Sequence, residues 1–121
     1  MDTKRTVVFA ASLKSDRYSN LAVVRLKENG YEAIPVGFRA GQIEGIDVIT
    51  NLEPIENVHT VTLYINPRRQ VEYYDYIFSL HPKRIIFNPG TENLELQKMA
   101  EARGIQTQVA CTLVLLNLGR Y

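Results

Sequence analysis

The sequence contains a single cysteine, Cys111, so no disulfide can form within the chain. This excludes a disulfide-stabilised secreted scaffold. No apolar run is long enough to cross a bilayer, and the first five residues lead into a strand-like segment without the hydrophobic region of a secretory signal. We therefore expect a cytoplasmic protein that makes no contact with a membrane.

The sequence also lacks an excess of charge of either sign. Lysine and arginine together number 14, aspartate and glutamate 13, and the formal net charge is +1. A nearly neutral chain has no general attraction to nucleic acid or to a membrane surface. We therefore expect no nucleic-acid partner. The two histidines, His59 and His81, do not have the spacing of a metal site, so we also expect no bound metal.

What the chain does contain is an alternation of short apolar segments with segments of helical period. The 121 residues suffice for one domain with an ordinary core, and we take residues 1–121 as that single domain. Residues 6–11 form a buried strand, residues 18–29 a helix that Gly30 ends, and residues 31–36 a second strand. These three segments make a complete β-α-β unit.

The same alternation continues to the end of the chain. Strands are predicted at residues 47–49, 60–65, 84–87 and 105–109, and a loop at residues 37–45. Asn66 and Pro67 have the residue types of a helix cap and first helical position, so a helix should run from there to about Leu80. Thr91 is predicted to cap a helix that ends at Gly104, and residues 112–118 form the last helix.

Alternating strands and helices predict an α/β fold with a parallel sheet covered on both faces. We expect a three-layer, Rossmann-like, doubly wound arrangement with a mainly parallel sheet of five to six strands. Such sheets bind ligands at the carboxyl ends of their strands, where the strand order reverses. This rule places the candidate site before any motif is considered.

Four loops come after the main strands at this edge, at residues 11–17, 37–41, 66–69 and 88–91. They carry five cationic residues and one acid, Asp16, and the first loop leads into a helix N-terminus, which favours an anion. A phosphate-bearing ligand is therefore expected here. The candidate binding residues in these loops are Ala11, Ser12, Lys14, Arg17, Gly37, Phe38, Arg39, Asn66, Pro67, Arg68, Asn88, Pro89 and Gly90.

The nature of the anion is narrowed by the residues after the first two strands. The G-x-G-x-x-G fingerprint of dinucleotide-binding proteins is absent from the first loop. Where NAD would need an acid after the second strand, the chain has Arg39, which suits a phosphate on the ribose. Coenzyme A and NADP both carry such a phosphate and a pyrophosphate, so the residues alone leave both open.

The same segments resemble the small stand-alone CoA-binding proteins, which are related to the N-terminal domain of the succinyl-CoA synthetase α subunit. The similarity lies in residues 7–12 followed by Arg17 and Tyr18, in residues 26–36, in residues 45–48, and in Cys111 at the start of the final helix. It covers nearly the whole chain. It implies a Rossmann-type domain that binds coenzyme A or an acyl-CoA.

The resemblance also implies roles for individual residues. It assigns the pyrophosphate to Ser12, Lys14 and Arg17, the adenosine and its 3′-phosphate to residues 37–39, and one wall of the cleft to Asn66 and Pro67. The chain departs from the family pattern at three places. Ala10 stands where the family has glycine, Gly37-Phe38 where it has Asn-Pro, and Ala110 where it has arginine.

No catalytic constellation falls at the predicted edge. His59 and His81 each precede a strand, so we expect both on the surface at the opposite, amino edge. Cys111 is either a thiol near a helix start or a small buried residue. We therefore predict a binding or regulatory module without catalytic activity. The alternatives are an NADP-dependent reductase and a protein-interaction module that uses the helix with Tyr73, Tyr74 and Tyr76, in its simplest form a homodimer.

Overall fold

A computed structural model describes residues 4–121. Its centre is a parallel sheet of five strands, in the order β2-β1-β5-β6-β7. The strands are β1 (Thr6–Phe9), β2 (Ala33–Val36), β5 (Thr60–Leu63), β6 (Arg84–Phe87) and β7 (Gln106–Val109). The chain passes from β1 to β2 on one side and then to β5 on the other, so the strand order reverses beside β1.

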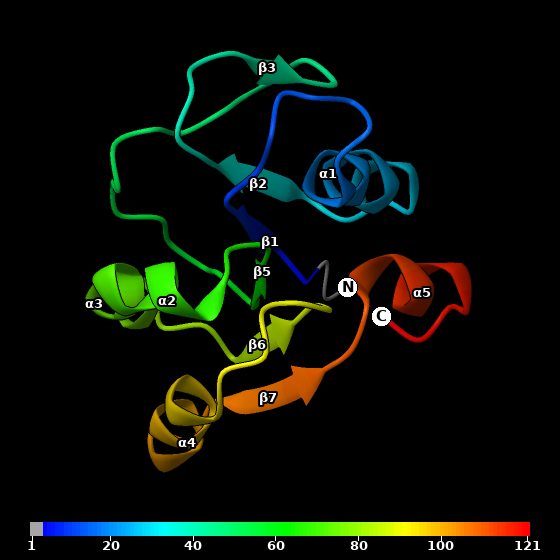
Figure 1. Cartoon of the computed structure of the whole chain (residues 1–121). Helices are drawn as coiled ribbons and strands as arrows, with labels where there is room; N and C mark the ends of the chain where they lie inside the picture. Colours follow the sequence, from blue (N-terminus) through cyan, green and yellow to red (C-terminus); the bar gives the residue numbers. More distant parts are fainter. Residues whose placement is uncertain (1–3) are drawn as a thin grey trace.

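Helices cover both faces of this sheet (Figure 1). One face carries α1 (Tyr18–Glu28) and α5 (Thr112–Asn117), and the other carries α2 (Pro67–Gln70), the 3₁₀ turn η1 (Val71–Tyr73), α3 (Tyr74–Ser79) and α4 (Leu94–Ala102). Successive strand residues feed the two resulting cores in turn. In β1, Val7 and Phe9 pack towards α3 and α4, and Val8 packs towards α1 and α5. The predicted three-layer, doubly wound α/β fold is confirmed.

The region after β2 differs from its prediction. The expected loop at residues 37–45 and strand at residues 47–49 are instead a small antiparallel hairpin of β3 (Gln42–Ile43) and β4 (Ile46–Asp47). Only Ile49 reaches the main sheet, through an isolated parallel bridge to Val36. Glu44 and Gly45 form a tight turn with positive φ angles, and Gly45 supplies the freedom that this turn needs. The sheet therefore has five strands and not six.

Two helix boundaries also differ. The predicted cap Thr91 is wrong, since α4 starts after Asn93, whose side-chain oxygen accepts from the backbone N–H of Leu96. The Thr91 hydroxyl instead donates to the carbonyl of Asn88 within the turn. The single helix expected at residues 67–80 is divided into α2, η1 and α3, although Asn66 caps α2 and Pro67 opens it as predicted.

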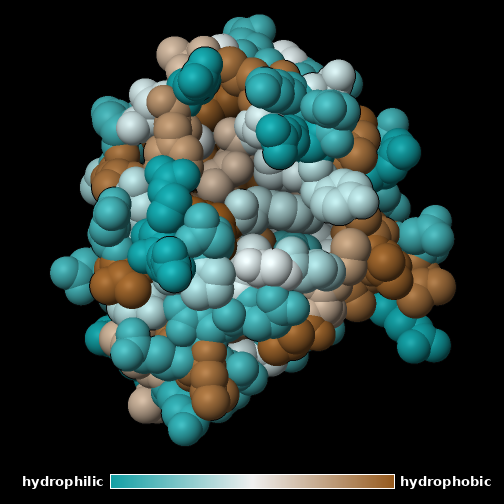
Figure 2. All heavy atoms as spheres, in the orientation of Figure 1, coloured by the Kyte–Doolittle hydropathy of each residue, from teal (hydrophilic) through white to brown (hydrophobic). Residues whose placement is uncertain are grey.

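The surface is mainly hydrophilic, but hydrophobic residues gather over α5, at the right of the molecule in Figure 2. Val114 and Leu118 of this region are more than half exposed. A homodimer or another protein partner stays a prediction, because nothing in the structure shows what contacts them. Within residues 4–121, no helix has the length and apolar character needed to span a bilayer.

Candidate functional site

The reversal of strand order places the candidate site over the carboxyl ends of β1 and β5, as expected for an open α/β sheet. The loop from β1 to α1 lies over this point. It starts at Ala10, which has φ of +69°, in the left-handed region that side chains other than glycine enter at a cost. This conformation gives a physical reason for glycine at the same place in the CoA-binding proteins that the chain resembles.

The first loop is held in place by polar residues of α1. The hydroxyl of Ser19 accepts from the backbone N–H of Ser12 at 3.0 Å, and the amide of Asn20 donates to the Ser12 carbonyl at 2.9 Å. The Ser12 hydroxyl in turn accepts from the backbone N–H of Lys14. Because Ser19 and Asn20 are buried, they fix the loop from beneath and leave its outer side open to a ligand.

The N-terminus of α1 has no internal counter-charge. Its cap residue, Arg17, makes no side-chain capping bond, and the first turn contains no acid. The free N–H groups and the dipole of an eleven-residue helix therefore favour an anion at this position. Lys14 and Arg17, both exposed, add positive charge at the same place.

Gly37 brings the loop after β2 against the loop after β1. A β-carbon at this position would lie 2.4 Å from the carbonyl oxygen of Ala11, which is a backbone atom and cannot move aside cheaply. The backbone N–H of Ala11 donates to the carbonyl of Val36, which joins the start of the first loop to the end of β2. The backbone N–H of Gly37 donates to the carbonyl of Ile49, in the segment after β4. Glycine is therefore required here by close approach of two backbones, and not by an unusual φ angle.

Phe38 extends from this loop across the end of β1 and is held from behind. The guanidinium of Arg69 lies 4.7 Å from the centre of its ring, and the Tyr73 ring lies 5.8 Å away. Tyr73 rests in turn on the buried Phe9 at 5.2 Å. Phe38 is nevertheless 47% exposed, so it presents a fixed aromatic surface to solvent at the candidate site.

Two adjoining hollows occupy the space between these loops, and we refer to them together as the carboxyl-edge hollow. They share the residues Ala10, Ser12, Leu13 and Arg39. The larger, about 520 Å³, extends over Lys14, Arg17, Tyr18, Ser19 and Tyr64. The smaller, about 150 Å³, is lined in addition by Ala11 and Phe38. Lys14 and Arg17 thus line only the larger part, Phe38 lines only the smaller, and Arg39 borders both.

None of the cations at this edge forms an ion pair with a carboxylate of residues 4–121. The two ion pairs found within residues 4–121 are Arg5 with Glu32 and Arg25 with Glu28, and both lie elsewhere. A group of positive side chains left without carboxylates around a hollow is the arrangement expected of an anion site. The cations concerned are Lys14, Arg17, Arg39 and Arg68, and also Arg69 behind Phe38.

The structure brings together only some of the predicted site residues. Those that line the carboxyl-edge hollow are Ala11, Ser12, Lys14, Arg17, Phe38 and Arg39. Gly37 lies directly beneath it. Asn66, Pro67 and Arg68 form the start of α2, outside the lining of the hollow, and Asn66 is used there as the helix cap. The residues 88–90 also lie outside this lining, although Pro89 and Gly90 are exposed at the same edge.

Asn88 has a supporting position. It is 1% exposed, and its amide donates to the Thr62 hydroxyl at 2.6 Å and to the Leu63 carbonyl at 2.9 Å. Its side-chain oxygen accepts from the backbone N–H of Thr112 at 2.8 Å. The side chain thus joins β5, β6 and the start of α5. The backbone N–H of Gly90 is also engaged, by the carboxylate of Glu92.

Five lining residues were absent from the predicted set: Ala10, Leu13, Tyr18, Ser19 and Tyr64. Tyr64 directly follows β5, so the end of a predicted strand at the reversal point was the available signal. Burial raises the pKa of Tyr64, and the nearby Cys111 adds to this effect. Its hydroxyl is buried without a normal hydrogen bond, although the Thr112 and Thr62 hydroxyls are near enough to oppose the rise.

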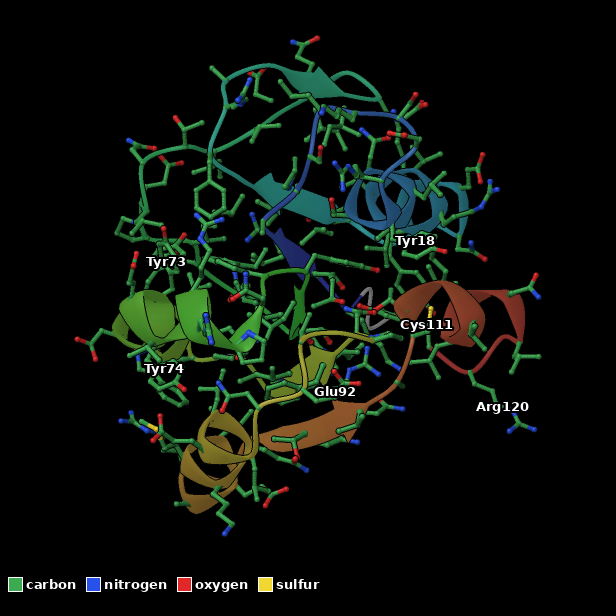
Figure 3. The ribbon with its side chains drawn as sticks, in the orientation of Figure 1. Tyr18, Tyr73, Tyr74, Glu92, Cys111 and Arg120 are labelled. Carbon is green, nitrogen blue, oxygen red and sulfur yellow. The ribbon has the colours of Figure 1, made fainter. Side chains whose placement is uncertain are left out.

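The remaining candidate groups lie away from the hollow. His59 and His81 are at the amino edge, and His59 is only partly exposed because it contacts the Thr60 hydroxyl. Tyr74 and Tyr76 use their hydroxyls internally, on Glu95 and the Glu53 carbonyl. In Figure 3, Tyr18 and Cys111 lie on the α1 and α5 side of the molecule, and Tyr73 and Tyr74 on the opposite side.

No group of histidine, cysteine, aspartate or glutamate side chains in the described part of the chain could hold a metal ion. What the hollow offers is positive charge, the N-terminus of a long helix, small residues and one aromatic surface. This combination suits a ligand with several phosphate groups and a planar base.

Comparison with known proteins agrees with this description. A family described as "CoA binding domain" matches residues 4–117. A search of curated proteins finds no match. A crystal structure of an uncharacterized protein is 47% identical, covers the whole of both chains and superposes with a TM-score of 0.96.

Two more distant structures show how widely the fold occurs. A hypothetical protein from Pyrococcus horikoshii OT3 is 26% identical, with a TM-score of 0.81, over 92% of this chain and 80% of that one. A dinucleotide-forming acetyl-coenzyme A synthetase from Ca. Korarchaeum cryptofilum, in complex with phosphate and ADP, is 14% identical, with a TM-score of 0.72. The match covers 90% of this chain and 26% of the synthetase, so it concerns one part of a larger protein and shows the fold alone.

Proposed function

The chain belongs to the CoA-binding domain family, and on this basis we propose that it binds coenzyme A or an acyl-CoA in the carboxyl-edge hollow. The observation that carries the proposal is the set of unpaired cations around the open N-terminus of α1. Coenzyme A has a pyrophosphate and a ribose 3′-phosphate, which need positive charge at two separate places. The hollow provides both.

The proposed orientation follows from the lining residues. The pyrophosphate lies at the start of α1, where Lys14 and Arg17 face it. The ribose phosphate lies at Arg39, which borders both parts of the hollow. The adenine lies in the smaller part, against the ring of Phe38. Phe38 needs no reordering for this contact, because Arg69 and Tyr73 already hold it.

We propose a binding or regulatory role and no catalytic one. The residues that line the larger part of the hollow include serine, lysine and tyrosine, but no carboxylate or imidazole to act as a base on a hydroxyl nucleophile. The ligand would be held for a partner or sensed by it. NADP remains the alternative ligand, because it carries a pyrophosphate and a ribose phosphate as well.

Calorimetric titration tests this proposal. Wild-type protein is titrated with coenzyme A, with dephospho-CoA, which lacks the 3′-phosphate, and with NADPH. We expect coenzyme A to bind about tenfold more tightly than dephospho-CoA, since one charge-assisted phosphate contact is worth about 1.4 kcal/mol. Arg39→Gln should remove most of this difference, and Arg120→Gln, which changes an exposed arginine outside the hollow, should preserve it.

The competing outcomes are distinct. Tighter binding of NADPH than of coenzyme A would identify NADP as the ligand of the carboxyl-edge hollow. Equal affinity for coenzyme A and dephospho-CoA would contradict the role given to Arg39. Absence of binding by all three nucleotides would refute the proposed function.

A further inference from the structure

A second hollow lies at the other end of the sheet, and we refer to it as the amino-edge cleft. Its volume is about 740 Å³, larger than either part of the carboxyl-edge hollow. It is bounded by the residues that precede β1, β5 and β6, by residues 54–58, and by the end of α3. It shares no lining residue with the carboxyl-edge hollow, so nothing in the proposed coenzyme site accounts for it.

The cleft combines an apolar floor with a border of basic side chains. Val58 and Leu80 are buried, and Ile55 is partly buried and packs on the same core. Arg5, His81 and Lys83 border it, with Glu56 as the one lining acid. Arg5 is engaged by Glu32 at 3.1 Å and donates to the Glu56 carbonyl. No carboxylate of the described residues pairs with Lys83 or His81.

His81 is held at a cost in backbone energy. The helices α1, α4 and α5 are each followed by a glycine with positive φ, at Gly30, Gly104 and Gly119. After α3 the corresponding position is His81, with φ of +48°. Glycine is the residue that ends a helix in this way without strain. His81 takes this strained conformation on the border of the cleft, so its side chain is a candidate for contact with a ligand there.

We propose that the amino-edge cleft binds an organic carboxylate with a small apolar body. The apolar part lies on Val58, Leu80 and Ile55, and the carboxylate lies between Lys83 and His81. Both parts of the ligand are needed. A small inorganic anion would bury none of the apolar floor, and a neutral apolar ligand would make no charge-assisted hydrogen bond to Lys83. We therefore expect both kinds of ligand to bind more weakly than an organic carboxylate.

The two histidines provide the measurement, because the chain contains no others and both line the cleft. Their two imidazole Cε1–H signals are followed by NMR at constant pH, and His81→Gly assigns them. Benzoate is the probe, with neutral benzamide and inorganic phosphate as comparisons. We expect benzoate to shift the signals saturably, with an affinity at least about fivefold above that of either comparison, a difference of about 1 kcal/mol.

Two variants locate the binding. Lys83→Met keeps the length of the side chain and should weaken benzoate binding about fivefold, while Lys98→Met on α4, an exposed lysine outside the cleft, should leave it unchanged. His81→Gly should raise the thermal midpoint by relieving strain and should also weaken benzoate, measured then on His59. A higher midpoint with unchanged affinity would contradict the role of His81.

The proposal is overturned if benzoate leaves both histidine signals in place, if benzamide acts equally, or if Lys83→Met and Lys98→Met behave alike. Coenzyme A should leave the histidine signals unshifted. Failure at this cleft therefore says nothing against the carboxyl-edge site, and failure of coenzyme binding says nothing against the cleft.

Discussion

The two ends of the sheet both carry positive charge, but they use it differently. At the amino end, Arg5 is paired with Glu32, and the buried Arg84 donates to the Thr60 hydroxyl and to the Tyr121 carbonyl. These arginines tie segments of the fold together. At the carboxyl end, Lys14, Arg17 and Arg39 are paired with no carboxylate among the described residues and surround an open helix N-terminus.

The surroundings of the charges differ as well. In the carboxyl-edge hollow, the small residues Ala10 and Ser12 lie beneath the long basic side chains, which allows a phosphate to approach main-chain N–H groups. The amino-edge cleft is built on buried aliphatic side chains, which favour an apolar ligand body. We therefore expect the type of anion bound at each end to follow from the residues that lie beneath the positive side chains. The net charge of +1 for the chain gives no sign of either proposed site.

Gly37→Ala should lower the free energy of unfolding more than any other substitution proposed here, through a collision at the carboxyl edge of the sheet. The added carbon would collide with the Ala11 carbonyl, so we expect a loss of about 3 kcal/mol in the free energy of unfolding. Urea denaturation measures it. In Gly45→Ala, where no atom lies within 4 Å of the new carbon but φ is +77°, the loss should be about 1 kcal/mol. Equal losses in the two variants would refute the close approach at Gly37.

Asn88→Ala tests whether Asn88 stabilises the fold at the carboxyl edge or contacts coenzyme A. It removes hydrogen bonds to Thr62, Leu63 and Thr112, and the expected loss is about 2 kcal/mol in the free energy of unfolding. Affinity of the folded fraction for coenzyme A should change by less than about threefold, which is under 0.7 kcal/mol. A large loss of affinity without a loss of stability would make Asn88 a ligand contact after all.

Arg17→Gln should weaken coenzyme A binding about tenfold, or about 1.4 kcal/mol, through loss of a charge at the start of α1. Titration at two salt concentrations provides the check. Because the contact is at an exposed site, the difference between variant and wild type should shrink as salt increases. A difference that is independent of salt would point to altered loop structure. Stability should be nearly unchanged, since Arg17 makes no side-chain cap.

Ala10→Gly should change the free energy of unfolding by a small amount, and it should raise this free energy where Gly37→Ala and Asn88→Ala lower it. Relief of the left-handed conformation at Ala10 exceeds the entropy cost of glycine, so we expect a gain of about 0.5 kcal/mol in the free energy of unfolding. Thermal and urea unfolding both report it. A clear loss of stability would mean that the Ala10 side chain packs favourably enough to outweigh its backbone strain.

The hydrophobic periodicity of the segments and the residues at helix ends were sufficient to predict the fold. All five strands of the main sheet were predicted, four of them from apolar segments and the polar β7 from its place after the Gly104 helix end. Gly30 and Gly104 marked helix ends that the structure confirms. The hairpin β3–β4 was missed because each of its strands has two residues, too few to show alternation. Thr91, the predicted cap, and Asn93, the observed one, both belong to residue types that cap helices, and only the path of the turn selects Asn93.

The meeting of the loops at one edge was predictable, because parallel strands bring the loops after them to the same edge. What the sequence did not show is which residues of each loop line the hollow; that these residues bind a ligand stays a prediction. Asn88 has the residue type of a polar binding group, yet its bonds are all internal. Arg69 has the residue type of a phosphate contact, yet its guanidinium lies behind Phe38. Both assignments depend on contacts between segments that are distant in sequence.

The most direct test of the central claim is amide NMR mapping of the coenzyme site. Coenzyme A is added to ¹⁵N-labelled protein, and each backbone N–H shift is followed. We predict that the largest changes fall in residues 10–19 and 37–39, around the carboxyl-edge hollow, while His59, His81 and Lys83 at the amino-edge cleft stay in place. Changes centred on the amino-edge cleft, or no changes at saturating coenzyme A, would contradict the account.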